Sequence, residues 1–385
     1  MSLKPSIHQS LQTIQEELYE LSRKVHANPE LGFKEVKACA WQIELLEKWG
    51  FKVETPYAGM DTAYRAVYGS GAPVFAVLSE YDALPGIGHA CGHNLICACS
   101  MGAGKAISDY LKENKLPGTL LVVGTPAEEG FGGKIPMVEK GCFNEVDAAI
   151  MAHPSDNTQA WYGSLGVTHY HVFYKGLASH AGGSPEKGKN ALDAVMLLFA
   201  GVNAWREHTV EDSRIHGVVT DGGDAPNIVP EKAACCFYVR ANDVDTLAGM
   251  EKRFEQIAQA AAMMTDTEVE IKIASGYKPG LPSPALNQAY HEVTAALGMT
   301  PIVPKRGGRG STDFSDVSQV VPGSHVYFKI CEKGTAAHSQ AFAEAAASEF
   351  GRQQMLKASE ALANIGVRFF EDSEFRTALL KEKKE

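Results

Sequence analysis

The sequence lacks the features that mark membrane proteins and nucleic-acid-binding proteins. It contains no apolar run approaching the ~20 residues that a membrane span requires, and the segment from Met1 to Ser10 is polar and does not resemble a signal peptide. It also lacks an excess of basic residues, because 46 acidic side chains outnumber 36 basic ones and give a net charge of −10. This charge argues against nucleic acid and anionic membrane surfaces as partners.

Paired cysteines are also missing. The eight cysteines are scattered, and they form neither the spacing of a zinc ribbon nor the framework of a disulfide-rich secreted protein. We therefore expect a reduced, cytoplasmic protein. With 385 residues, 45% hydrophobic and 21% charged, the chain has the composition of an ordinary globular protein and the length for two domains, or for one domain with an insertion.

Strands and helices alternate through most of the chain. Apolar runs predict strands at 63–68, 73–79, 118–124, 147–152 and 323–330, and helical periodicity predicts helices at 7–25, 35–48, 95–111, 285–297, 316–320 and 342–365. This alternation is typical of an α/β protein with a mostly parallel sheet covered by helices. We assign this catalytic domain to residues 1–163 and 276–385.

Residues 164–275 follow a different order, strand–helix–strand–strand–helix–strand. The first strand, at 167–174, alternates in the manner of a half-exposed strand. The order is that of a ferredoxin-like (βαββαβ) unit. We therefore predict an inserted lid or dimerisation domain.

The stretch from Glu80 to Asn94 carries the highest density of reactive side chains. It follows the apolar strand at 73–79, and its glycines and single proline indicate a shaped loop and not a helix. Its candidate metal ligands or ligand-orienting groups are Asp82, His89, Cys91 and His93. Thiolate, imidazole and carboxylate groups together suit zinc or a similar divalent ion.

Two other strands of the predicted parallel sheet also end in candidate ligands. Glu128 and Glu129 follow the strand at 118–124, and His153 follows the strand at 147–152. Open α/β sheets bind ligands at the carboxyl ends of their strands. His338, in a turn before the last helix, is a further candidate. Each residue alone has an ordinary structural explanation, but together they predict a metal site.

The adjacent Glu128 and Glu129 suggest that the two carboxylates have different roles. One carboxylate would bind metal, and its neighbour would accept a proton from a metal-bound water and deliver it to a leaving amine. Two cations ~3.5–4 Å apart would lower the pKa of the water and polarise an amide carbonyl. A bridging ligand would offset the repulsion between the cations, and Cys91 is the candidate.

Short segments spread over nearly the whole chain match a known family in family order. They are His26-Ala-Asn-Pro-Glu-Leu-Gly, Tyr81-Asp-Ala-Leu-Pro, His89-Ala-Cys-Gly-His93, Pro126-Ala-Glu-Glu-Gly130, Ser179-His-Ala-Gly-Gly-Ser-Pro, Asn227-Ile-Val-Pro230 and Ala337-His-Ser. The chain thus resembles the co-catalytic metallopeptidase family twenty, which contains glutamate carboxypeptidase, aminoacylase, hippurate hydrolase and the plant auxin-conjugate amidohydrolases. It looks like the amidohydrolase branch with a bridging Cys, which includes aminobenzoyl-glutamate hydrolase and a β-alanyl-lysine-type dipeptidase.

The resemblance implies a role for each matching residue. Cys91 would bridge the metals, and the other ligands would be His93, Glu129, His153 and His338. Glu128 would be the general base, and Asp82 would orient a ligand. The implied cofactors are two divalent metal ions per subunit, Zn²⁺ or Mn²⁺, with Co²⁺ and Ni²⁺ also compatible. Asn94 stands where the branch commonly has Asp, which predicts less negative charge near the metals.

Four residues outside this cluster are candidates for contact with substrate. His180 and Asn227 match family positions that reach the active site, often that of the partner subunit, although both could instead cap loops. Arg240 ends a strand and could clamp a substrate carboxylate or be an ordinary surface arginine. Ser311 lies in the loop Gly307–Asp313, which resembles a substrate-contacting loop more than a phosphate cradle.

We interpret the chain as a two-metal amidohydrolase or dipeptidase. It would cleave a small N-acyl amino acid or a dipeptide with a free carboxylate, using a metal-activated water and Glu128 as general base. The resemblance further implies a homodimer through the inserted domain, with His180 acting in the neighbouring subunit. The alternative is a catalytically silent binding or regulatory protein on the same fold, which the complete ligand set disfavours. A thiol enzyme using Cys91 lacks a resolving cysteine.

Overall fold

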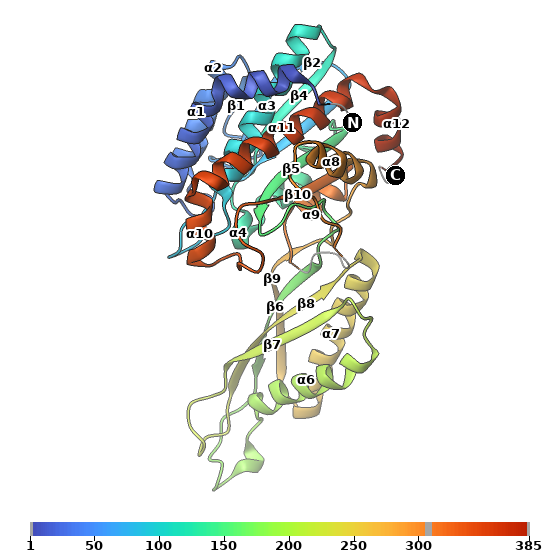
Figure 1. Ribbon diagram of the computed structural model, residues 1–385. Helices are drawn as coiled ribbons and strands as arrows, with labels where there is room; N and C mark the ends of the chain where they lie inside the picture. Colours follow the sequence, from blue (N-terminus) through green and yellow to red (C-terminus); the bar gives the residue numbers. More distant parts are fainter. Residues whose placement is uncertain (1–2, 305–309, 383–385) are drawn as a thin grey trace. The chain divides into compact units, whose positions relative to one another are not determined.

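The computed structural model describes residues 3–304 and 310–382, and it divides into two compact units. Unit 1 contains residues 3–163, 281–304 and 312–382, and unit 2 contains residues 164–280 with 310 and 311. Figure 1 labels most of their helices and strands. Residues 307–309 of the predicted substrate-contacting loop lie outside the described residues.

Unit 1 is built, within its described residues, on a six-stranded sheet in the order β1-β2-β4-β3-β5-β10. The strands are β1 (Lys52–Glu54), β2 (Tyr64–Ser70), β3 (Val74–Ser79), β4 (Gly118–Gly124), β5 (Ala148–Ser155) and β10 (Gly323–Lys329). The four strands β4, β3, β5 and β10 are parallel, and β1 and β2 extend one edge in antiparallel fashion. The prediction of a mostly parallel sheet is confirmed.

Helices cover both faces of this sheet. They are α1 (Pro5–Ala27), α2 (Val36–Lys48), α3 (His93–Asn114), α4 (Glu128–Phe131), α5 (Lys134–Glu139), α8 (Pro284–Ala296), α9 (Phe314–Ser318), α10 (Gln340–Ala347), α11 (Glu349–Glu371) and α12 (Ser373–Glu382). Phe75 and Val77 of β3 belong to one core with α1, α3 and α11, which lie together in Figure 1. Ala76 and Leu78 belong to the opposite core with α5 and α9. Because successive strand residues face opposite sides, burial on both sides explains why this strand is apolar throughout.

One predicted helix is two helices in the structure. The apolar pattern at 342–365 predicted a single helix, but α10 and α11 are separated at Ser348. The backbone of Ser348 is extended, and its hydroxyl accepts a hydrogen bond from the N–H of Gly351 at 2.9 Å. Ser348 therefore acts as the N-cap of α11.

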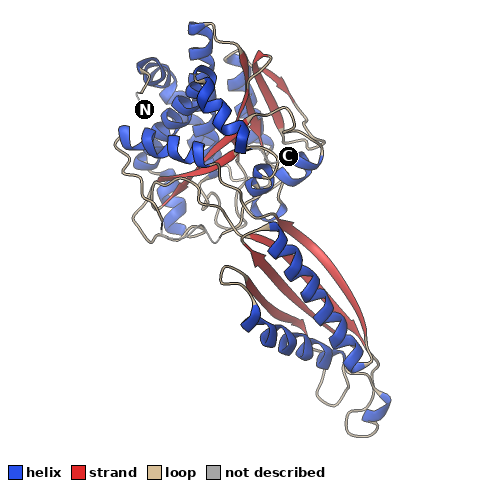
Figure 2. Ribbon diagram, turned by 90° about the vertical axis from the view of Figure 1, so that its right-hand side faces the viewer, coloured by secondary structure: helices blue, strands red, loops and turns tan. Residues whose placement is uncertain are grey.

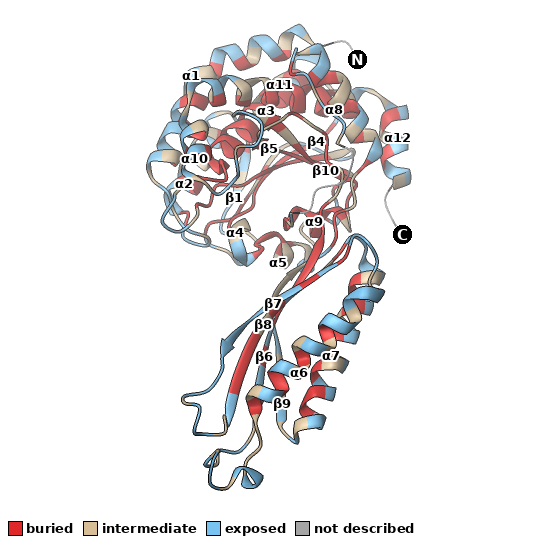
Figure 3. Ribbon diagram, turned by 60° about the horizontal axis from the view of Figure 1, so that its bottom comes forward, coloured by how far each residue is buried: buried red, intermediate tan, exposed pale blue. Residues whose placement is uncertain are grey.

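Unit 2 is an antiparallel sheet with two long helices, which Figure 2 shows alongside the sheet. Its elements are β6 (Gly166–Lys175), η1 (Pro185–Lys187), α6 (Ala191–Trp205), η2 (Arg206–His208), β7 (Arg214–Asp221), β8 (Lys232–Ala241), α7 (Val244–Thr265) and β9 (Glu268–Tyr277), with the strand order β7-β8-β6-β9. The predicted order of strands and helices is observed. In β6, Tyr170, Val172 and Tyr174 are buried in the core that α6 and α7 form, whereas His171 and Phe173 are exposed. Figure 3 shows buried and exposed residues alternating along both helices.

Among residues 3–304 and 310–382, no helix combines the length and the apolar character that crossing a membrane would need.

Candidate metal centre

Six side chains predicted to form one site come together in unit 1. The ligand atoms of Cys91, His93 and His153 lie within 4.8 Å of one another, and so do those of Cys91, Glu129 and His338. His93, Glu128 and Glu129 form a third such group. Cys91, His93 and Glu129 each belong to two of the three groups, and Cys91 is the member that the sequence analysis proposed as the bridge between two ions. The roles of these residues as ligands stay predictions.

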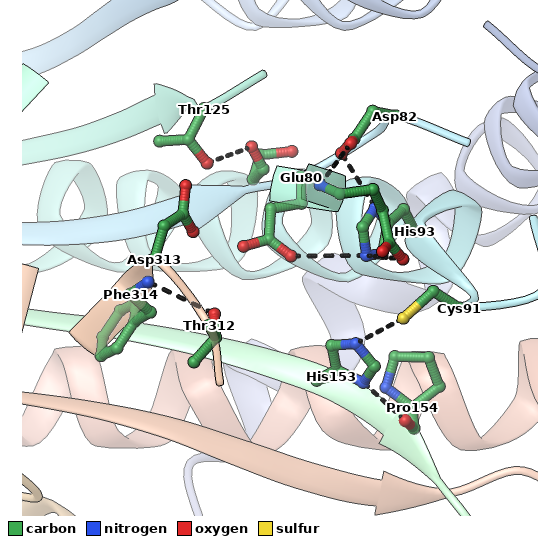
Figure 4. A network of polar contacts seen from close by, with 12 residues as sticks. Glu80, Asp82, Cys91, His93, Thr125, His153, Pro154, Thr312, Asp313 and Phe314 are labelled. Atoms are coloured by element: carbon green, nitrogen blue, oxygen red, sulfur yellow. Dashed lines mark hydrogen bonds and ion pairs between the residues drawn. The ribbon is translucent and has the colours of Figure 1, made fainter. Parts of the chain in front are cut away.

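The loop between β3 and α3 brings Cys91 to β5. Gly92 has φ +80°, and a Cβ atom at this position would lie 2.5 Å from Cγ of Pro154, so only glycine fits here. The sulfur of Cys91 lies 3.3 Å from Nε2 of His153 (Figure 4). His153 was predicted to follow its strand, but it lies within β5, opposite Tyr327 of β10.

Asp82 contacts two of the candidate ligands. Its Oδ1 lies 3.0 Å from Nδ1 of His93, and its Oδ2 accepts a hydrogen bond from the N–H of Glu129 at 2.9 Å (Figure 4). Burial alone would raise the pKa of Asp82, but the charge and hydrogen bond of His93 outweigh it and hold that pKa below its ordinary value. Because Nδ1 of His93 is engaged, Nε2 is the atom left to bind an ion.

The two remaining histidines differ in their surroundings. Nδ1 of His153 lies 2.6 Å from the carbonyl oxygen of Pro154, and burial lowers the pKa of His153 to about 4, which favours the neutral ring that binds metals. Nε2 of His338 lies 3.3 Å from Oε1 of Glu129, and this contact raises the pKa of His338. The N–H of His338 donates to the carbonyl of Ala90 at 3.0 Å, which holds its turn against the Cys91 loop.

The donor atoms fit divalent cations. Nε2 of His93, Oε1 of Glu129 and Oε2 of Glu80 are all buried without a hydrogen-bond partner among the described residues. Buried polar atoms that lack partners cost about 1–3 kcal/mol each, so such a group indicates something that satisfies them. A thiolate, three imidazoles and carboxylates together match the ligands that zinc and related ions take.

Sequence reasoning missed a buried ion-pair cluster beside this group, formed by Lys134, Glu80 and Asp313. Nζ of Lys134 lies 2.7 Å from Oδ1 of Asp313 and also pairs with Glu80, and all three side chains are fully buried. Burial alone would lower the pKa of Lys134, but the negative charges of Asp313, Glu80 and Glu128 outweigh it and raise that pKa. Lysine is almost never fully buried unless paired, and a lysine after a glycine-rich turn carries no sequence signal for burial.

Glu128 lies next to this ion-pair cluster. Burial, together with the negative charges of Glu80 and Asp313, raises the pKa of Glu128 well above its ordinary value. The carboxylate of Glu80 that pairs with Lys134 also has its second oxygen, Oε2, 3.7 Å from Nε2 of His93. The ion-pair cluster therefore contacts the predicted metal ligands directly.

The Glu80–Asn94 stretch also contains His89, a candidate ligand or ligand-orienting residue, and Asn94, which stands where the related branch commonly has Asp. His89 belongs to none of the ligand groups in the described part of the chain, and its ring centroid lies 6.1 Å from that of His26. The side-chain amide of Asn94 donates to Oγ of Ser22 and to the carbonyl of Ala346, both at 3.0 Å. Asn94 thus has a packing role between α3, α1 and α10, because an aspartate would lack these donors.

The predicted substrate-contacting residues lie in unit 2. Nδ1 of His180 accepts hydrogen bonds from the N–H groups of Gly182 and Gly183, which is the loop-capping role weighed above. The carbonyl of Asn227 accepts from the N–H of Ala181 at 2.9 Å, next to His180. Nη1 of Arg240 donates to Oγ of Ser311 at 3.0 Å. Within unit 2, Asn227 therefore binds the residue next to His180, and Arg240 binds Ser311. Contact of these residues with substrate stays a prediction.

Replacing Cys91 with serine is expected to lower the bound metal below that of the wild type, because a serine hydroxyl stays protonated at neutral pH and bridges two cations poorly. Metal analysis of the purified variant measures this. The same change at Cys97, which is buried in α3 and donates to the carbonyl of Asn94, is the matched control and should retain full metal. Two full equivalents in the Cys91 variant would contradict the bridging role.

Comparisons with known proteins agree on one group of hydrolases. The sequence pattern of the peptidase family M20/M25/M40 matches residues 76–364. The chain is 37% identical to the Xaa-Arg dipeptidase of Mus musculus over 387 residues, which cover 95% of this chain and 88% of the relative. It is 33% identical to one of the p-aminobenzoyl-glutamate hydrolase polypeptides of Escherichia coli (strain K12) over 302 residues, which cover 72% of this chain and 62% of that relative.

A solved structure shows the same fold. A Bacillus subtilis protein, described as a dinuclear metal binding peptidase from the M20 family, matches this chain with a TM-score of 0.73 and 20% identity. The match covers 94% of this chain and 99% of that protein. At this identity the likeness concerns the fold alone.

Proposed function

Because this chain belongs to the peptidase family M20/M25/M40, we propose that it is a metal-dependent hydrolase that cleaves the amide bond of a dipeptide or a small N-acyl amino acid. Its named relatives include a dipeptidase, an aminobenzoyl-glutamate hydrolase and an indole-acetyl-amino acid hydrolase. These substrates share an amide bond next to an amino acid that carries a free carboxylate. The observation that carries the proposal is the overlap of three ligand groups, two of which contain Cys91 while the third contains Glu128.

The position of Glu128 suits a general base. It shares a ligand group with His93 and Glu129, so its carboxylate can take a proton from a water held there and pass it to the leaving amine. Asp82 fixes both neighbours through Nδ1 of His93 and the N–H of Glu129. Bound divalent cations would lower the pKa of the water and polarise the amide carbonyl.

The finer details are also proposals. Two ions per protomer, Zn²⁺ or Mn²⁺, are supported by the donor types and by the shared Cys91. A cytoplasmic location is supported by the eight cysteines, all of which are described and unpaired. A homodimer through unit 2, with His180 acting in the partner, rests on the resemblance, and sedimentation as a single chain would contradict it.

The function is tested with a panel of substrates. Protein stripped of metal by a chelator should be inactive, and added Zn²⁺, Mn²⁺ or Co²⁺ should restore hydrolysis of some Xaa-Arg or Xaa-Lys dipeptides or N-acyl amino acids. Amidating the carboxylate of the best substrate should lower kcat/KM about 10–100-fold, because hydrogen bonds to a charged group contribute about 1.5–3 kcal/mol. A metal-loaded, folded protein that hydrolyses nothing on the panel would instead favour the catalytically silent binding protein.

A further inference from the structure

The loop that carries Glu128 and Glu129 has a strained backbone. Ala127, immediately before Glu128, has φ +61°, a left-handed conformation that costs a residue with a Cβ atom roughly 1–2 kcal/mol. The loop also turns back on itself, since a Cβ atom at Gly133 would lie 1.9 Å from the carbonyl oxygen of Pro126. Contacts with other segments must therefore hold this shape.

Three buried carboxylates from other segments each accept one backbone N–H from this loop. Oδ2 of Asp82 binds the N–H of Glu129 at 2.9 Å, and Oδ2 of Asp313 binds the N–H of Lys134 at 2.9 Å. Oε1 of Glu35 binds the N–H of Ala127 at 2.8 Å, at the strained position itself. Asp82 also contacts His93, and Asp313 also pairs with Lys134, whereas Glu35 forms no ion pair within the described part of the chain, so its burial needs another explanation.

Glu35 connects the turn at Ala127 to Thr62 through its side chain. Its side chain is fully buried, although it precedes α2, where a glutamate would ordinarily be exposed. Its Oε2 accepts a hydrogen bond from Oγ1 of Thr62 at 2.9 Å, and its carbonyl accepts from the N–H of Cys39 at 2.9 Å. Burial raises the pKa of Glu35 to about 7, so the protein gives up stability to keep this carboxyl group where it is.

We propose that Glu35 is a positioning residue for Glu128, whose hydrogen bond to the N–H of Ala127 holds the left-handed turn that sets the direction of the Glu128 side chain. This inference rests on the proposed function of Glu128. What Glu35 supplies is an oxygen at a fixed place and not a charge. Glutamine provides that oxygen without the charge, whereas aspartate keeps the charge on a side chain shorter by one methylene group.

The experiment therefore compares Glu35→Gln with Glu35→Asp. The aspartate variant should lower kcat about 100-fold, the loss expected when a reacting group is misplaced by about 1 Å, with KM and metal content unchanged. The glutamine variant should stay within about threefold of the wild type. Hydrogen exchange of the segment 125–134 should rise in the aspartate variant and not in the glutamine variant.

A matched control separates positioning from general loss of stability. Glu360 is also a buried carboxylate of unit 1, and it lies on α11, bound to His8. Glu360→Asp should lower the melting temperature without lowering kcat. Thr62→Val, which removes the other hydrogen bond to Glu35, should also lower kcat. It is the alternative test if the aspartate variant fails to fold.

Three results would overturn the inference: equal losses of kcat in Glu35→Gln and Glu35→Asp, unchanged exchange of 125–134 in the aspartate variant, or a similar loss of kcat in Glu360→Asp. Failure of the proposed function gives a different result. The wild type would then hydrolyse no substrate, while the exchange measurement would still decide whether Glu35 holds the loop.

Discussion

Glu128→Gln is expected to lower turnover ~10²–10⁴-fold while metal content and melting temperature stay close to those of the wild type. The amide has nearly the shape of the carboxylate, so the fold and the neighbouring ligands persist, but it cannot accept a proton from water. Steady-state kinetics on the best substrate of the panel, together with metal analysis, measure this.

Glu139→Gln is the matched control for this variant. Glu139 is exposed at the end of α5, in the same stretch of chain, and its replacement should leave kcat unchanged. If Glu128→Gln turns over within about threefold of the wild type, Glu128 is not the general base, and the proton transfer must be assigned to another group.

Lys134→Met is expected to lower the free energy of unfolding by about 3–5 kcal/mol, the usual result of removing one partner from a buried ion pair. Glu80 and Asp313 would remain fully buried without their cation. Methionine replaces the aliphatic part of lysine well, so lost packing contributes little. Urea unfolding with the slope held constant measures the loss.

The effect of this variant should depend on pH. Burial already raises the pKa of Asp313, with Lys134 opposing that shift. Without Lys134, the folded protein should hold a proton on this carboxyl group to higher pH than the unfolded chain does, so stability falls as pH rises. The loss should therefore be greater at pH 8 than at pH 5. The control is Lys112→Met, at an exposed position of α3, which should change the free energy of unfolding by less than about 0.5 kcal/mol at either pH. An equally small change for Lys134→Met would contradict the structural role of the ion-pair cluster.

The sheet and the predicted ligands could be found from the sequence because their signals are local. The apolar runs that became β3, β4 and β5 are buried on both faces, and this burial is visible as composition. Cys91 and His93 lie at the end of the loop that follows β3, and Glu129 follows β4, so the order of the strands predicted that these residues meet at one edge. The strand β1 was not predicted, because three residues with two exposed side chains show no periodicity.

The buried charged residues that surround the candidate metal centre could not be predicted in this way. Glu35, Lys134 and Asp313 are charged residues in polar or glycine-rich surroundings, where exposure is the ordinary outcome. They are buried because segments distant in the sequence meet: Glu35 lies 92 residues from Ala127, and Lys134 lies 179 residues from Asp313. Such burial results from tertiary packing and leaves no local pattern.

The half-exposed ring of His338 makes the two ligand groups that contain Cys91 differ in their exposure to solvent. The side chain of His93 is fully buried, whereas that of His338 is 52% exposed on a turn ahead of α10. An ion held by Cys91, Glu129 and His338 would have one exposed ligand, whereas an ion held by Cys91, His93 and His153 would have none. The ion with the exposed ligand would then be the first to leave for a chelator and the first to be exchanged for another metal, so the two positions would differ in kinetics even with similar donors.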